Sequence, residues 1–195
     1  MSARLIALPR LLLVVAVAAV LVGSSLHLSA QAPVEKFRGV AINLNGGPSS
    51  GTVEFAIERW STAAERNALL TIIKENKNPT DKLLSALEKM PKMGYLRSTS
   101  SLGWELKYAW QEKLDDGGRR IVVATDRPMT FRETVNQPRT TDYPFTFIEM
   151  RFNRDDQGQG KILAGSRIYT DKKGNIVLEN YAIEPLRFNE IKKVN

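Results

Sequence analysis

The segment GWELKYAWQEKLDDGGRRIVVATD, residues 103–126, decides the predicted fold. Its first half places large apolar or amphipathic side chains at alternate positions, namely Trp104, Leu106, Tyr108 and Trp110. A period of two is typical of a half-buried β-strand, and we interpret this stripe as core rather than as the lining of a cavity. The turn residues DDGG, 115–118, then predict a tight hairpin into RRIVVATD. The segment therefore predicts two antiparallel strands.

Alternating patterns continue on both sides of this hairpin. Before it, apolar residues alternate in FRGVAINLN and in TVEFAIERW, and the turn-rich segment 45–51 predicts a loose hairpin between them. After it, TFIEMRF alternates, and turns at 155–160 and 171–175 lead into KILAGSRIYT and IVLENYAIEP. We expect LRFNEIKKV, residues 186–194, to add an edge strand. Adjacent aspartates followed by glycine do not match an EF-hand, so DDGG and DDQGQG are interpreted as turns rather than calcium sites.

Residues 61–91 interrupt the strands with helical patterns. Thr62 and Glu65 have the spacing of a capping box, and a cluster of apolar residues follows on one helical face. Asn78-Pro79 predicts the start of a second helix, and Pro91 predicts its end. Because amphipathic helices in globular domains normally face the core, we expect both helices to pack on the sheet.

The predicted fold class is α+β and mainly antiparallel β. We expect a curved sheet or barrel-like meander of about eight strands, with a two-helix insertion at residues 61–91. A two-sheet sandwich is the alternative. No internal repeat or domain boundary interrupts residues 33–195, which are therefore expected to form one domain.

Residues 1–32 have the features of a secretory signal peptide. Arg4 and Arg10 precede an apolar run over residues 11–22, and small and polar residues follow up to Ala30 and Ala32. The run is shorter than the roughly 20 apolar residues that span a membrane. We therefore expect cleavage near residue 31 or 33, a periplasmic or extracellular location, and no stable membrane insertion.

Removal of this leader would leave a chain without histidine or cysteine. The single histidine, His27, lies in the leader, and the sequence has no cysteine. This composition excludes Ser-His-Asp and Cys-His catalysis, as well as zinc sites made of thiolates or imidazoles. We expect no cofactor and no metal.

The charge of the chain is moderately basic. The formal net charge is +7, of which the arginines at 4 and 10 contribute two. The basic residues are spread among acidic ones, which favours a solvated surface over a nucleic-acid footprint. We therefore expect no nucleic-acid partner, whereas an anionic ligand or a component of the cell envelope remains a candidate.

Residues 126–144 form the candidate binding site. A connection this long between two strands exceeds the roughly 12–15 residues that are usual, and such loops are often functional. The loop contains prolines and aromatic residues but no glycine, which predicts an ordered loop. Arginine forks suit carboxylates and phosphates, although the neighbouring acids could instead pair with them. The predicted binding residues are Arg127, Arg132, Glu133, Arg139, Asp142 and Tyr143.

These observations favour an exported, non-catalytic binding or interaction domain that uses the loop 126–144 and the adjoining end of the sheet. The first alternative is a carboxylate-dependent hydrolase of envelope or extracellular substrates, which would need two acids across a cleft. The acids available for such a pair are Asp126, Glu133, Asp142 and Glu149. The second alternative is a structural component of the envelope.

Several segments also carry a resemblance to a known group of proteins: ERWSTAAER (58–66), GYLR (94–97), SLG (101–103), GGRRIVVATDRP (117–128) and DYPFTFIEMRF (142–152). With these segments the chain resembles a family of exported bacterial proteins of unassigned function. The resemblance implies secretion and a single domain. It carries no catalytic residues.

Overall fold

The computed structural model describes residues 34–43, 50–98, 103–129, 144–163, 167–171, 174, 176–179 and 186–194. The chain divides into two units, residues 1–31 and 32–195, and every described residue belongs to the second. The predicted signal peptide lies outside the described residues. Within the described ranges, no helix is both long enough and apolar enough to cross a membrane.

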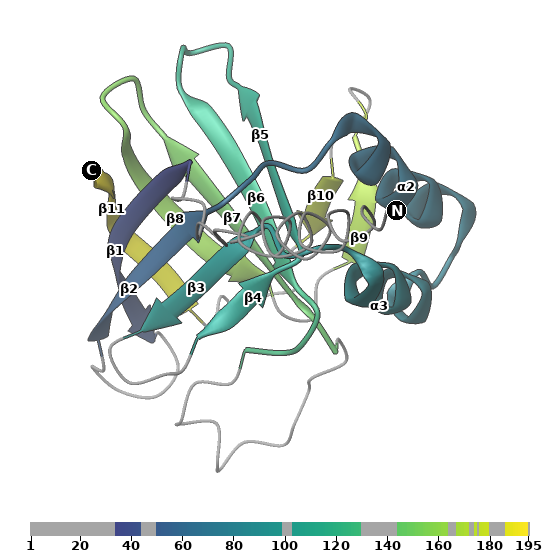
Figure 1. Ribbon diagram of the computed structural model, residues 1–195. Coiled ribbons are helices and arrows are strands. Elements are labelled where there is room, and N and C mark those ends of the chain that lie inside the picture. Colours follow the sequence, from purple (N-terminus) through teal and green to yellow (C-terminus); the bar gives the residue numbers. More distant parts are fainter. Residues whose placement is uncertain are drawn as a thin grey trace, which may run out of the picture. The chain divides into compact units, whose positions relative to one another are not determined.

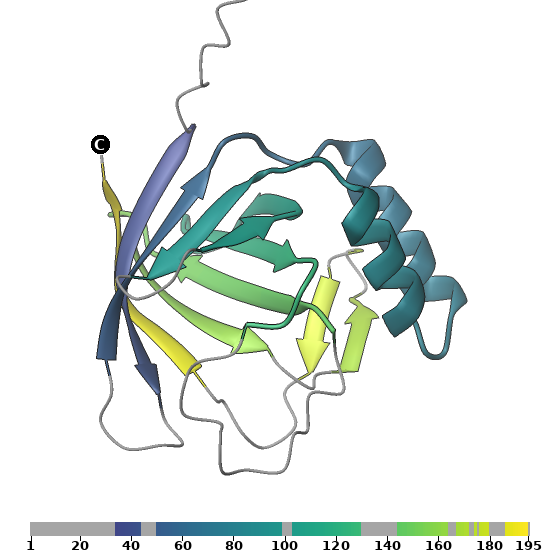
Figure 2. The same cartoon turned by 60° about the horizontal axis from the view of Figure 1, so that its bottom comes forward.

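One nine-stranded antiparallel sheet dominates the second unit (Figure 1). Its strand order is β4-β3-β2-β1-β11-β8-β7-β6-β5. The strands are β1 (Glu35–Asn43), β2 (Ser50–Ile57), β3 (Gly94–Ser98), β4 (Trp104–Leu106), β5 (Tyr108–Lys113), β6 (Arg119–Thr125), β7 (Thr146–Phe152), β8 (Gln157–Leu163) and β11 (Leu186–Val194). The sheet curls into a nearly closed barrel (Figure 2). The predicted α+β class with a curved, barrel-like sheet is confirmed.

The remaining elements lie outside this barrel wall (Figure 2). They are helix α2 (Ala63–Glu75), helix α3 (Thr80–Lys89) and a two-stranded sheet of β9 (Arg167–Thr170) and β10 (Ile176–Glu179). Apolar side chains of both helices and both short strands form one cluster with the outward-facing residues of β5, β6 and β7. The helices therefore pack on the sheet, as their apolar stripes predict.

Strand β6 is buried on both faces, which explains its apolar sequence. Ile121 and Val123 belong to the cluster inside the barrel, whereas Val122 and Ala124 belong to the cluster under the helices. A strand that is covered on both sides reads as a continuous apolar run rather than as an alternation.

The prediction of one strand through residues 104–113 is wrong. The chain breaks at Lys107 into β4 and β5, which form the two opposite edges of the sheet. Leu106 and Ala109 face the barrel interior, whereas Tyr108 lies under the helices. The extra residue reverses the side-chain direction, because a shift of one residue exchanges the two faces of a strand.

The segment before α2 covers the β5 edge at Ala109. The backbone N–H of Ser61 donates to the carbonyl of Ala109 (2.8 Å), and the Ser61 hydroxyl accepts from the N–H of Ala109 (3.1 Å). The N–H of Lys107 donates to the carbonyl of Ala124 (2.8 Å). A covered edge does not pair with other chains, so these bonds protect the β5 edge at Ala109 from edge-to-edge association.

The prediction that residues 186–194 form an edge strand is also wrong. Strand β11 lies between β1 and β8 and pairs with both. Its interior-facing residues Phe188 and Ile191 are fully buried. A long-range pairing places the strand at the centre of the sheet, and local sequence does not encode that pairing.

The start of α2 is stabilised by the capping box that the sequence predicts. Thr62 accepts from the N–H of Glu65, and the Glu65 carboxylate accepts from the N–H of Thr62 (2.7 Å). The same carboxylate accepts from Arg59 (2.6 Å). The hydrogen bond from Arg59 is the main cause that lowers the pKa of Glu65 to about 2.

We expect Glu65→Gln to lower the free energy of unfolding by up to about 1 kcal/mol at neutral pH, because the ion pair with Arg59 is partly exposed. The folded-state pKa of Glu65 lies below its ordinary value of 4.5, so its charge stabilises the fold above that value. The difference between the variant and the wild type should shrink as the pH falls toward about 2. Urea unfolding between pH 2 and 7 measures this, and a constant difference would show that the charge does not contribute.

Candidate functional site

Only one residue of the predicted loop site lies in the described part of the chain. Arg127 is exposed, and its guanidinium donates to the carbonyl of Gly103 (2.6 Å). This contact fits the alternative in which the arginines hold the loop to the sheet. The other predicted binding residues lie outside the described residues: Arg132, Glu133, Arg139, Asp142 and Tyr143.

Both described ends of this loop are fixed to the sheet. The hydroxyl of Thr125 donates to the carbonyl of Arg127 (2.6 Å), and the hydroxyl of Thr146 accepts from the N–H of Met129 (2.9 Å). Thr125 and Thr146 are both buried. Residues 125–129 and 144–146 therefore form an ordered base for the loop.

The two described acids of the hypothetical catalytic pair are held by cations. Asp126 lies 3.6 Å from the ammonium of Lys107. Glu149 is buried and accepts from Arg151 (2.8 Å) and Arg120 (3.0 Å). Burial alone would raise the pKa of Glu149, but these two arginines hold it below its ordinary value. A general acid needs a raised pKa, so Glu149 is poorly suited to that role.

Side chains fill the described interior of the barrel. The rings of Phe37 and Phe152 lie 5.0 Å apart, and those of Phe55 and Phe188 lie 5.2 Å apart. These rings belong to one buried cluster that receives residues from every strand of the main sheet. Such packing is typical of a closed core and not of a carrier that encloses its ligand.

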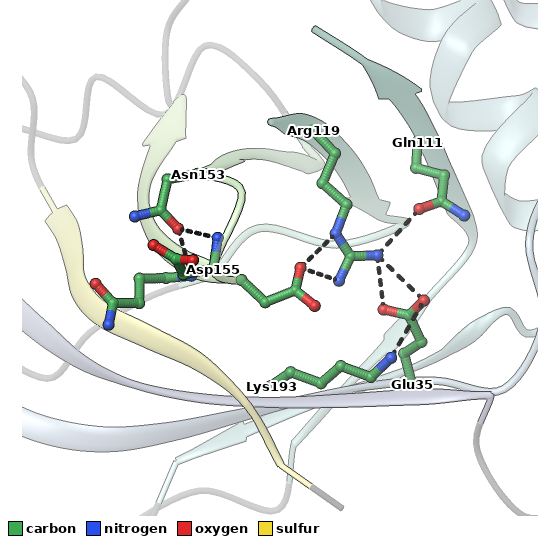
Figure 3. A network of polar contacts seen from close by, with 8 residues as sticks. Glu35, Gln111, Arg119, Asn153, Asp155 and Lys193 are labelled. Carbon is green, nitrogen blue, oxygen red and sulfur yellow. Dashed lines mark hydrogen bonds and ion pairs between the residues drawn. The ribbon is translucent and has the colours of Figure 1, made fainter. Parts of the chain in front are cut away.

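A polar network joins strands from opposite sides of the barrel (Figure 3). Arg119 of β6 donates to Glu35 of β1 (2.9 Å), to Gln111 of β5 (3.2 Å) and to Asp156 (3.0 Å). Its guanidinium carbon lies about equally far from the Phe37 and Phe152 rings, at 5.4 and 5.3 Å. Nε and Nη1 of Arg119 donate within this network, and Nη2 lies 2.9 Å from the Asp156 carboxylate without making a hydrogen bond. Because its charge is met by these internal acids, we interpret the network as structural.

A second network of charged residues lies beneath the β9–β10 sheet. Arg120 donates to Glu149, to Glu112 (2.8 Å) and to the carbonyl of Ile176 in β10 (2.6 Å). Arg66 of α2 stacks on Trp110 with its guanidinium carbon 4.9 Å from the ring centroid. The cavity among these residues has a volume of about 10 Å³, which is room for one water molecule at most. These contacts hold the β9–β10 sheet against the main sheet. The cavity among them is too small to bind a substrate.

The outer face of β1, β11 and β8 is basic. Phe37, Phe188 and Ile162 point into the barrel, so the residues beside them in each strand point outward. The outward-facing cations of β3, β1, β11, β8 and β7 are Arg97, Lys36, Arg38, Arg187, Lys192, Lys161 and Arg151. Sequence analysis missed this surface, because the cations come from segments far apart in the chain.

Three described carboxylates lie on or beside this face. Glu190 of β11 is exposed, whereas Glu54 of β2 and Glu149 of β7 are engaged by arginines. Glu54 of β2 accepts from Arg97 (2.7 Å) and from the Tyr95 hydroxyl (3.1 Å) and lies 3.8 Å from Arg38. Burial alone would raise the pKa of Glu54, but Tyr95 and Arg97 hold it below its ordinary value. Glu149 is buried and is bound by its two arginines. The face therefore keeps an excess of positive charge.

Two further observations bear on function. Among the described residues, no group of three or more histidine, cysteine, aspartate or glutamate side chains is placed to hold a metal ion. No family model, no curated protein and no solved structure matches the chain.

Proposed function

We propose that this protein is an exported, non-catalytic binding domain for an anionic component of the cell envelope or its surroundings. The observation that carries the proposal is the basic outer face of β1, β11 and β8. Outward-facing cations from three neighbouring strands gather there, and within the described part of the chain Lys161 and Lys192 have no carboxylate at ion-pair distance. A surface of one sign attracts ligands of the opposite sign and speeds their association.

Three features support binding rather than catalysis. The described interior is filled, so it offers no cleft for a substrate. The described acids Asp126 and Glu149 are engaged by cations. A chain without its leader would also contain neither histidine nor cysteine, the usual bases and nucleophiles of hydrolases. Export is proposed from the charged and apolar pattern of residues 1–32.

A binding assay with soluble polymers tests this proposal. The protein recovered after export is titrated by calorimetry with polygalacturonate and with polyphosphate, and neutral dextran serves as the control. We expect binding to both polyanions but not to dextran, and we expect it to weaken by about tenfold or more as the salt rises from about 0.05 to about 0.5 M. Failure to bind either polyanion, or release of shortened polymer during the assay, would contradict the proposal.

A further inference from the structure

We infer that the outer face of β1, β11 and β8 binds an extended anionic polymer across two pairs of like-charged side chains. The first pair is Arg38 and Lys192, and the second is Arg187 and Lys161. The inference rests on the proposed function and adds to it the kind of ligand and the residues that bind it.

Each pair consists of residues that lie directly opposite one another on neighbouring strands. Arg38 of β1 is in register with Lys192 of β11, and Arg187 of β11 is in register with Lys161 of β8. Side chains in such positions start about 4.5–5.5 Å apart, and like charges there destabilise a sheet. Lys192 and Lys161 therefore gain nothing from these pairings in the folded protein, whereas an anion bound beside either lysine would offset the repulsion.

Neighbouring acids neutralise the first pair only in part. Arg38 is 60% exposed and lies 3.8 Å from Glu54, which already accepts a shorter hydrogen bond from Arg97. The other neighbour of Lys192 in the sheet is Gln157, which is uncharged. Glu190 of β11 is exposed two positions before Lys192, but no described carboxylate lies at ion-pair distance from Lys192. The pair therefore keeps part of its positive charge, on Lys192.

The second pair has an acid beside it, but that acid is engaged. Lys161 lies opposite Glu149 of β7. One carboxylate oxygen of Glu149 accepts from Arg120 and the other accepts from Arg151. Lys161 is therefore left without an ion pair among the described residues.

The distance between the two pairs indicates a polymer. Arg187 and Lys192 lie on the same strand, five positions apart, which corresponds to roughly 16 Å along β11. A small anion cannot reach both pairs at once. A polymer with repeated carboxylates or phosphates can reach both pairs. Once one of its anionic groups is bound, the next group meets the second pair at a high effective concentration.

The shape and composition of the face favour a soluble polymer over a lipid surface. The face is the outside of a curled sheet, so a flat bilayer would touch only part of it (Figure 2). Basic surfaces that bind membranes stably usually add buried apolar contacts. Among the described residues the large exposed apolar side chains are Val34, before β1, and Tyr169, on β9. Neither lies on the strands of this face.

A pair of double variants tests the inference with polygalacturonate as the probe. Lys192→Glu with Lys161→Gln removes both like-charge pairs, and Lys77→Glu with Lys89→Gln makes the same change in net charge near the helices. We expect the first variant to bind at least about tenfold more weakly than the wild type and the second to bind within about twofold. The first variant should also melt no lower than the wild type, because a cross-strand repulsion has been removed.

Further measurements distinguish the polymer from a small anion, from a lipid surface and from a site in the loop. Monomeric galacturonate and vesicles of phosphatidylglycerol should bind much more weakly than the polymer. Equal affinity of the sheet variant and the wild type, or preferred binding to vesicles, would overturn the inference. Loss of binding only on replacing Arg127, Arg132 and Arg139 with alanine would place the site in the loop, and the proposed function would survive. Absence of binding to every polyanion would overturn both.

Discussion

Replacing Arg120 with alanine is expected to lower the free energy of unfolding by about 3–5 kcal/mol, since it would leave the buried Glu149 carboxylate with only the exposed Arg151 as its partner. The Arg120 side chain is 7% exposed and that of Glu149 is 9% exposed. Arg120 also donates to Glu112 and to the carbonyl of Ile176 in β10. Its loss would therefore also weaken the attachment of the β9–β10 sheet to the main sheet. Urea unfolding at neutral pH measures the effect.

Two further variants test whether the loss of stability arises from the burial of the Arg120–Glu149 pair. Arg154→Ala removes an exposed arginine whose donor bonds the carbonyl of Asp116, and it should cost less than about 1 kcal/mol. Arg120→Met combined with Glu149→Leu should recover much of the lost stability, because no unpaired charge of this pair remains buried. A cost below about 1 kcal/mol for Arg120→Ala would contradict the structural role given to the network.

The loss of unfolding free energy caused by Arg120→Ala should also depend on pH. The folded-state pKa of Glu149 is lowered in the wild type, so its charge stabilises the fold above the ordinary pKa of 4.5 and that contribution is lost as the pH falls through the lowered value. Arg120 is one of the groups that lower the pKa of Glu149, so its removal weakens this contribution. The unfolding free energies of the variant and the wild type should therefore differ most near neutral pH and least in acid.

Gly94→Ala is expected to cost about 3 kcal/mol through a steric clash in the sheet. Gly94 lies in β3 between β2 and β4, and a Cβ atom there would overlap the carbonyl oxygen of Ala56. That oxygen belongs to the backbone of a paired strand, so it cannot move away without disrupting the pairing of β2 with β3. Thermal unfolding followed by circular dichroism measures the loss.

Gly51→Ala is the matched control for this substitution. Gly51 also lies in a strand, β2, but no atom would lie within 4 Å of an added Cβ. We expect a change of no more than about 0.5 kcal/mol. Equal stability of the two variants would show that β2 and β3 do not pair with the register described.

Local signals in the sequence were sufficient to predict the helices and the strand-rich barrel. The capping box of Thr62 and Glu65 and the segment Asn78-Pro79 act over a few residues, so the helices could be placed without tertiary information. The break at Lys107 could not be predicted in this way. It depends on the closure of the barrel, which makes β4 and β5 opposite edges of one sheet.

The candidate site shows the same division between local and long-range information. Alternation within EKFRGVAIN could have shown that Lys36 and Arg38 share a face, and the same holds for Arg187 and Asn189 in LRFNEIKKV. Local sequence does not show that β11 joins β1 to β8, nor that a register shift turns Lys192 toward Arg38. The interpretation of the basic residues as dispersed along the chain followed from this missing register.

Mapping the contact surface on the folded protein is the most direct test of the claim that this basic face binds an anionic polymer. Backbone amide chemical shifts of the exported protein are recorded during titration with an oligogalacturonate of about ten sugars. We expect the largest shifts in residues 36–42, 157–161 and 187–193, on β1, β8 and β11. Shifts confined to residues 103–129 and 144–146, at the base of the loop, or the absence of saturable shifts, would contradict it.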